Sequence, residues 1–126
     1  MIPSSVHAEV IGQAQARPGL ELREAAWLQV MPDPASIDQL KAFGAGERSA
    51  IALAQTLSAK LIIDDQKART AAEQLGVSCA GTLNVIGQAK SLGLITQVKP
   101  ILDELIGNSF RISPKVVAKI LSSFGE

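Results

Sequence analysis

Short apolar runs alternate along the chain with longer stretches whose apolar positions repeat at helical spacing. In the clearest run, Leu61, Ile62 and Ile63 follow one another without polar alternation, which is typical of a strand buried on both faces of a parallel sheet. The segments 27–30 and 77–79 predict two further short strands. Because helical patterns separate the three runs, we expect parallel pairing through right-handed crossovers, and therefore an α/β fold.

The helical stretches carry start and stop signals. Cap residues or apolar spacing predict helices at 3–11, 20–26, 47–59 and 65–76, and three more that begin near Thr82, Pro100 and Pro114. Gly76 and Gly93 are expected to end helices, and the segments 12–19 and 31–34 to form a loop and a break. Two apolar stripes are clear: Ala50, Ile51, Ala54 and Leu57 in one helix, and Val117, Ile120, Leu121 and Phe124 in the last.

The length and composition limit the class of protein. A chain of 126 residues with 47% hydrophobic residues predicts one folded domain over residues 1–126. No apolar run approaches the roughly 18–20 residues of a membrane span, and the first residues do not have the pattern of a secretory signal. The single cysteine, Cys79, excludes an internal disulfide and a multi-cysteine zinc site. We therefore expect a cytoplasmic protein.

The charges argue against a strongly basic nucleic-acid surface. The formal net charge is zero, with five Lys/Arg and eight Asp/Glu in residues 1–66 and seven and four in residues 67–126. The chain has three Phe, one Trp and no Tyr, so an aromatic platform for stacking bases is not expected. Any nucleic acid would have to be held at a local site rather than by charge alone.

Two adjacent carboxylates, Asp64 and Asp65, follow Ile63 at the end of a strand predicted over residues 60–64. In open parallel sheets, ligands bind beyond the carboxyl ends of the strands. One interpretation is that these residues simply cap the next helix, where an anion is favoured. Since a helix needs only one cap residue, the other interpretation is that Asp65 binds a cation, with Asp64 as a cap or outer neighbour.

Two glutamates extend this pattern. Glu47 lies in the first turn of its expected helix, on the stripe that should face the sheet, and Glu9 lies one turn beyond Val6. Either could be an ordinary solvated side chain. If Glu9, Glu47, Asp64 and Asp65 instead converge within bridging distance of one cation, their oxygens predict a Mg²⁺ or Mn²⁺ site.

The remaining candidates have simpler interpretations. His7, the only histidine, is expected at the surface, and Cys79 in the core, so catalysis by a histidine-activated nucleophile is not expected. Lys67 and Arg69 could contact phosphates near the acidic pair, although a solvated helix face is the simpler interpretation. No phosphate-binding loop is present in the sequence.

Several segments together resemble one known family. "IPSSVHAEV", "GERSAIALA", "LIIDDQKARTAAEQLGV" and "GTLNVIGQAKSLGLI" occur in this order, followed by "SFRISPKVVAKILSSFGE". They are similar to the PIN-domain-like family of small prokaryotic predicted nucleases, which are often encoded beside a small antitoxin-type partner. The resemblance covers nearly the whole chain.

This resemblance implies a three-layer α/β/α fold with a short parallel sheet. It also implies that acidic residues bind Mg²⁺ or Mn²⁺ and that RNA phosphodiesters are hydrolysed. Glu9, Glu47 and Asp65 match the family's catalytic and metal-binding acids, with Asp64 beside them. The implied partners are an RNA substrate and, in a toxin–antitoxin pair, a small antitoxin-like protein.

The resemblance departs from the family at the N-terminus. Family members begin with a central strand that ends in Asp-Thr-Ser, whose Asp is a principal metal ligand, whereas Met1 falls after this point. Three accounts follow: a missed upstream start, a truncation that a partner repairs, or an inactive remnant. The alternative function is therefore a non-catalytic interaction module that forms a homodimer or binds a small partner through an exposed sheet edge.

Overall fold

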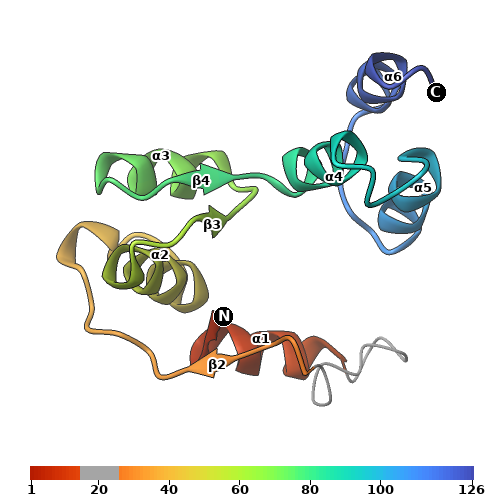
Figure 1. The fold of residues 1–126 in the computed structure, drawn as a ribbon. Helices are drawn as coiled ribbons and strands as arrows, with labels where there is room; N and C mark the ends of the chain where they lie inside the picture. Colours follow the sequence, from red (N-terminus) through yellow and green to blue (C-terminus); the bar gives the residue numbers. More distant parts are fainter. Residues whose placement is uncertain (15–25) are drawn as a thin grey trace. The chain divides into compact units, whose positions relative to one another are not determined.

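The computed structural model describes residues 1–14 and 26–126, which form two compact units, Met1–Ala80 and Gly81–Glu126 (Figure 1). Most of the predicted helix of 20–26 and of the predicted loop of 12–19 lies outside the described residues. In the first unit the elements follow one another in this order: β1 (Ile2–Pro3), α1 (Ser4–Ala14), β2 (Val30–Met31), a short 3-10 helix (Asp38–Leu40), α2 (Ala45–Leu57), β3 (Leu61–Ile62), α3 (Gln66–Gln74) and β4 (Cys79–Ala80).

The strands pair in parallel, as predicted, but they form two separate two-stranded sheets. In one sheet Ile2 lies opposite Val30, and in the other Leu61 lies opposite Cys79. The β1 strand was not predicted, because its two residues directly precede a helix and have no pattern of their own. The predicted strands of 27–30 and 77–79 form slightly later in the chain, as β2 and β4.

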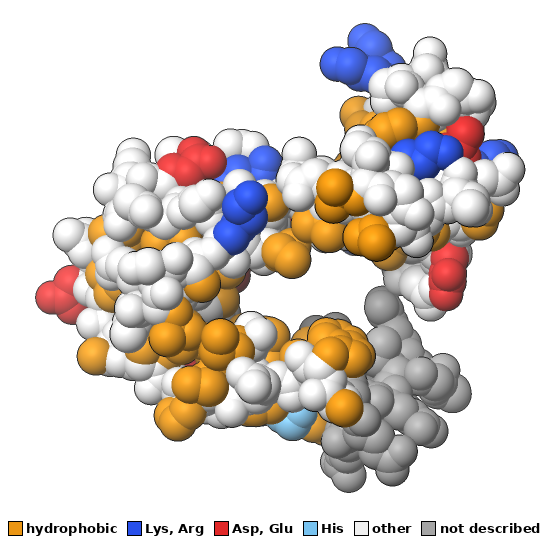
Figure 2. Space-filling view, viewed as in Figure 1, with side chains coloured by type: hydrophobic (Ala, Val, Ile, Leu, Met, Phe, Trp, Pro, Cys, Tyr) orange, Lys and Arg blue, Asp and Glu red, His pale blue; other side chains and the backbone are white. Residues whose placement is uncertain are grey.

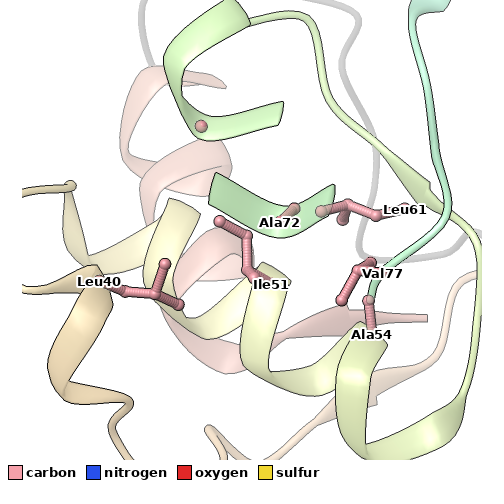
Figure 3. Close-up of a cluster of buried hydrophobic side chains, with 7 residues drawn as sticks. Leu40, Ile51, Ala54, Leu61, Ala72 and Val77 are labelled. Carbon is pink, nitrogen blue, oxygen red and sulfur yellow. The ribbon is translucent and has the colours of Figure 1, made fainter. Parts of the chain in front are cut away.

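The core of the first unit lies around α2. Ile51 is fully buried and Leu40 nearly so. They pack with Ala54, with Leu61 of β3, and with smaller apolar residues from α3 and the loop before β4 (Figure 3). This confirms most of the predicted stripe on α2. Its last member, Leu57, is 40% exposed. This end of the apolar stripe therefore lies outside the buried cluster that the described residues form.

The second unit contains three helices at the predicted starts: α4 (Thr82–Ser91), α5 (Lys99–Gly107) and α6 (Pro114–Ser123). Ser113 caps α6 by accepting a hydrogen bond from the Val116 N–H at 3.4 Å. Gly93, predicted to end α4, has φ +71°, a left-handed conformation that glycine adopts without strain. The predicted stripe on α6 is half-buried: Val117, Ile120, Leu121 and Phe124.

A carboxylate joins the end of this unit to the start of α5. The oxygens of Glu126 accept hydrogen bonds from the Val98 N–H at 2.9 Å and the Lys99 N–H at 3.1 Å, and Lys90 Nζ lies 3.7 Å from Glu126 Oε2. The hydrogen bonds from Val98 and Lys99 hold the pKa of the Glu126 carboxyl below its ordinary value. Glu126 therefore supplies acceptors that the first turn of α5 lacks within the helix.

Acidification is expected to release Glu126 from α5. A carboxylate whose pKa is lowered by folding stabilises the folded state above its unfolded-state pKa, about 4.3 for Glu. That contribution is lost as the pH falls from there through the lower folded value. The amide resonances of Val98 and Lys99 should therefore shift together, with an inflection below about pH 4.3. The inflection should vanish in Glu126→Gln and persist in Glu104→Gln, an exposed change on α5; its persistence in Glu126→Gln would contradict the assignment.

In the described parts of the chain, no helix has the length and apolar character needed to cross a membrane.

Candidate functional site

The start of α2 brings together two of the four predicted acids. Glu9, on α1, reaches across to α2, where its Oε1 accepts a hydrogen bond from the Gly46 N–H at 3.1 Å. Gly46 is buried, and a Cβ placed on it would lie 2.8 Å from Glu9 Oε2. Only glycine therefore leaves room for the carboxylate in this position. Glu9 and Gly46 lie 37 residues apart in the sequence.

Glu47 lies beside this contact, in the first turn of α2. Its Oε2 accepts a hydrogen bond from the Gly44 N–H at 3.2 Å, and its side chain is half-buried. Both glutamates thus engage N–H groups at the same helix start, where the helix dipole favours negative charge. The local sequence pattern predicts Glu47 at the start of α2, but no local pattern predicts that Glu9 reaches the same helix start.

Asp65 lies at the start of α3. Its Oδ1 accepts a hydrogen bond from the Ala68 N–H at 2.8 Å, which makes it the N-cap residue. Asp65 and the preceding Asp64 are both exposed, just beyond the carboxyl end of β3. The structure therefore shows Asp65, rather than Asp64, as the cap of α3, and the strand delivers both aspartates to the expected end of the sheet.

The expected convergence of all the acids on one cation is not present in this conformation. Among residues 1–14 and 26–126, no three His, Cys, Asp or Glu side chains are grouped so that they could hold a metal ion. The physical reason is that Glu9 and Glu47 engage the start of α2, whereas Asp65 engages the start of α3. The assignment of Glu9, Glu47, Asp64 and Asp65 as ligands therefore stays a prediction.

The basic residues of α3 differ from each other. Lys67 is exposed, as a solvated helix face predicts. Arg69 is half-buried, and its Nη2 donates a hydrogen bond to the Ile63 carbonyl at 2.9 Å. This bond fixes the guanidinium beside the carboxyl end of β3, close in the chain to the acidic pair. Arg69 is therefore more than a solvated side chain.

The two remaining candidates are each half-buried. His7 was expected at the surface, but α1 leaves it only partly exposed. Cys79, expected in the core, packs against the edge of the buried cluster, and burial raises the pKa of its thiol. A raised thiol pKa lowers the fraction of reactive thiolate, which agrees with a packing role.

Asp33 is an acid that sequence reasoning missed. It lies in the Pro-Asp-Pro break, yet its Oδ1 accepts a hydrogen bond from the Ser5 N–H at 3.0 Å and so caps α1 from 28 residues away. This hydrogen bond holds the pKa of Asp33 below its ordinary value. No sequence signal could have identified this contact, since the two residues meet only in the folded chain.

A family model described as a PIN domain matches residues 1–126. The chain belongs to the PIN domain family. No curated protein and no solved structure matches it. The match confirms the resemblance and the α/β class, and it spans both units. PIN domains are generally metal-dependent nucleases that use divalent ions, so the acids at the starts of α2 and α3 are the natural candidates for such a site.

Proposed function

We propose that this PIN domain is a Mg²⁺- or Mn²⁺-dependent ribonuclease whose ligands are Glu9, Glu47 and Asp65, with Asp64 as an outer neighbour. The observation that supports this most strongly is the meeting of Glu9 and Glu47 at the start of α2. Glu47 accepts from Gly44, the residue before α2, and Glu9 accepts from Gly46 in the first turn of α2. Two carboxylates from separate helices therefore lie at one helix start, where their mutual repulsion favours uptake of a cation.

The chemical type of the four proposed ligands suits a hard divalent cation. All four candidates are carboxylates, which suit Mg²⁺ and Mn²⁺. Their observed hydrogen bonds use Oε1 of Glu9, Oε2 of Glu47 and Oδ1 of Asp65. Since each carboxylate has two acceptor oxygens, a backbone N–H can hold one oxygen while the other binds a cation. The described residues do not group three acids, so the side chains must move closer together to complete the site.

The chain's own residues would position the substrate. A bound divalent ion supplies an activated water and stabilises the leaving oxygen. Gly46 and Gly44 fix the carboxylates of Glu9 and Glu47 through their N–H groups. Arg69, held by the Ile63 carbonyl, and the exposed Lys67 are placed to contact RNA phosphates at the carboxyl end of β3. Phosphate contacts at one local site suit a chain that has no net charge to attract RNA.

The physiological setting that we propose follows the family resemblance. The domain would act in the cytoplasm as the toxin of a toxin–antitoxin pair, restrained by a small antitoxin-like protein. The competing function is a non-catalytic interaction module. It is favoured by the fact that Glu9, Glu47 and Asp65 each already engage a helix start, as purely structural carboxylates would.

Two measurements on the full chain separate these functions. The ribonuclease should cleave a labelled single-stranded RNA when Mn²⁺ is added and stop when EDTA removes the metal. Paramagnetic Mn²⁺ should also broaden the amide resonances of Gly46 and Ala68 before those of other residues of the first unit. Cleavage that persists in EDTA, or Mn²⁺ broadening that spares Gly46 and Ala68, would refute the proposal.

A further inference from the structure

The outer side of α6, in the second unit, carries two exposed lysines. Lys115 and Lys119 lie four positions apart in this helix, which places their Cβ atoms about 5–6 Å from each other on one side. Exposed Ser122 follows on the same side, one turn further on. Figure 2 shows Lys or Arg side-chain atoms projecting from the surface over α6. Lys115, Lys119 and Ser122 are called the basic face of α6 below.

The opposite side of α6 is packed within the second unit. It consists of the half-buried apolar stripe, which helical periodicity places across the helix from the two lysines: Val117, Ile120, Leu121 and Phe124. A Cβ added to Gly87 of α4 would lie 3.4 Å from Phe124 Cζ, so this stripe lies directly against α4. The hydrogen bonds that Glu126 accepts at the start of α5 hold the residues just after α6. Packing therefore fixes the basic face toward solvent.

The lysines of the basic face differ from other lysines of the chain. In the part of the chain that the structure describes, three lysines form ion pairs with carboxylates, at Nζ–oxygen distances of 2.7 to 3.7 Å: Lys41, Lys90 and Lys99. No carboxylate there pairs with Lys115 or Lys119. The sequence explains why, since residues 105–125 contain both lysines and Arg111 but no Asp or Glu. The chain therefore has a local positive surface although its net charge is zero.

This arrangement is unfavourable for the helix by itself. Like charges four positions apart destabilise a helix, and Lys115 lies in the first turn of α6, where the helix dipole disfavours a cation. Uncharged polar residues would keep the same side of α6 solvated without either cost. An anion with several charges, lying along the helix, would remove both costs at once.

We propose that the basic face of α6 binds the phosphate backbone of RNA, as a contact additional to the cleavage site. This inference rests on the proposed function, because the family match indicates a nucleic-acid partner and the proposed substrate is RNA. Each ammonium group can contact a phosphate of one strand. The exposed neighbour Ala118 is small, which lets the strand approach, and the Ser122 hydroxyl can donate to a phosphate oxygen. Such contacts add affinity without reading the base sequence.

The structure favours RNA over an anionic membrane as the ligand. Helices that lie on membranes insert their apolar side among the lipids, whereas the apolar side of α6 is packed against α4. A flexible single strand needs only a row of cations on one helix face. An acidic protein segment would meet the same charges, and the experiment below separates it from RNA.

A labelled oligonucleotide tests the proposal in EDTA, so that neither metal nor cleavage takes part. The probe is an oligouridine of about 20 nucleotides with a terminal fluorophore, and its anisotropy reports binding to the full chain at several salt concentrations. In Lys115→Gln/Lys119→Gln, the affinity at about 0.1 M salt should fall at least about tenfold. The slope of log affinity against log salt should become shallower by about 1.4, the value for two phosphate contacts on a single strand. Because glutamine and lysine have similar helix propensities, urea unfolding should change little.

A matched double variant controls for net charge. Lys41→Gln/Lys99→Gln removes the same charge from two exposed lysines that have carboxylate partners, and it should weaken RNA binding less than about threefold. Equal losses in the two double variants would assign the binding to net charge and overturn the proposal. Full affinity in Lys115→Gln/Lys119→Gln would overturn it as well. If poly-glutamate displaces the probe as well as unlabelled oligouridine does, the ligand is an acidic protein segment rather than RNA.

The outcome is distinguishable from that of the proposed ribonuclease function, which Mn²⁺-dependent cleavage tests separately. RNA binding that depends on the basic face, without any cleavage, would support this contact and refute the ribonuclease. Cleavage together with equal RNA affinities of the two double variants would support the ribonuclease and refute this contact. An unaltered chain that binds no oligouridine would also refute it.

Discussion

Replacing Asp65 with asparagine is expected to lower the rate of Mn²⁺-dependent RNA cleavage at least about 100-fold while leaving the fold unchanged. Asp65 caps α3 through one oxygen, which accepts from the Ala68 N–H. Asparagine is as good a cap residue as aspartate, so this hydrogen bond survives. The negative charge and the second carboxylate oxygen, which the proposed metal site needs, are lost. Cleavage rates and urea unfolding of both proteins provide the measurement.

Two further variants separate capping from catalysis. Asp65→Ala should lose cleavage equally and also lower the free energy of unfolding by about 1 kcal/mol, because it removes the cap. Asp33→Asn is the matched control, since Asp33 also accepts from a helix N–H but is outside the proposed ligand set. It should leave cleavage unchanged. If Asp65→Asn cleaves at the rate of the unaltered chain, Asp65 is only a helix cap and the ribonuclease assignment fails.

Replacing Gly46 with alanine is expected to lower RNA cleavage while leaving the free energy of unfolding nearly unchanged. The new Cβ would lie 2.8 to 3.0 Å from the Glu9 carboxyl atoms, so the carboxylate must leave the start of α2. Glu9 is exposed and its side chain is flexible, which makes this movement inexpensive. The hydrogen bond lost, about 1 kcal/mol, is offset by the better helix propensity of alanine, also about 1 kcal/mol. The free energy of unfolding should therefore change little.

Cleavage should nevertheless fall at least about tenfold in Gly46→Ala, because a ligand displaced from its position no longer supports the reaction. Gly12→Ala is the matched control: Gly12 lies in α1, and among the described residues no atom outside its own local backbone lies within 4 Å of an added Cβ. It should gain stability and retain full cleavage. Equal cleavage by both alanine variants would show that the position of Glu9 has no role in the reaction.

Residues close together in the sequence determined much of this fold. Ser113 and Pro114 begin α6, and an aspartate of the predicted acidic pair caps α3. Parallel pairing also follows from the alternation of short apolar runs and helices. These features depend on interactions within a few residues, such as a side chain capping the first turn or a stripe repeating every three to four positions, so the sequence alone contains them.

The tertiary structure decided what the local pattern could not. Glu9 reaches Gly46 across 37 residues, and Asp33 reaches Ser5 across 28, because packing of α1 against α2 and β2 against β1 brings these segments together. The two-residue strand β1 exists only because β2 offers a pairing edge. The sequence by itself therefore determined the helices, the parallel α/β class and the acidic residues. Long-range packing decided which acids meet, since such contacts depend on where the whole chain places its elements.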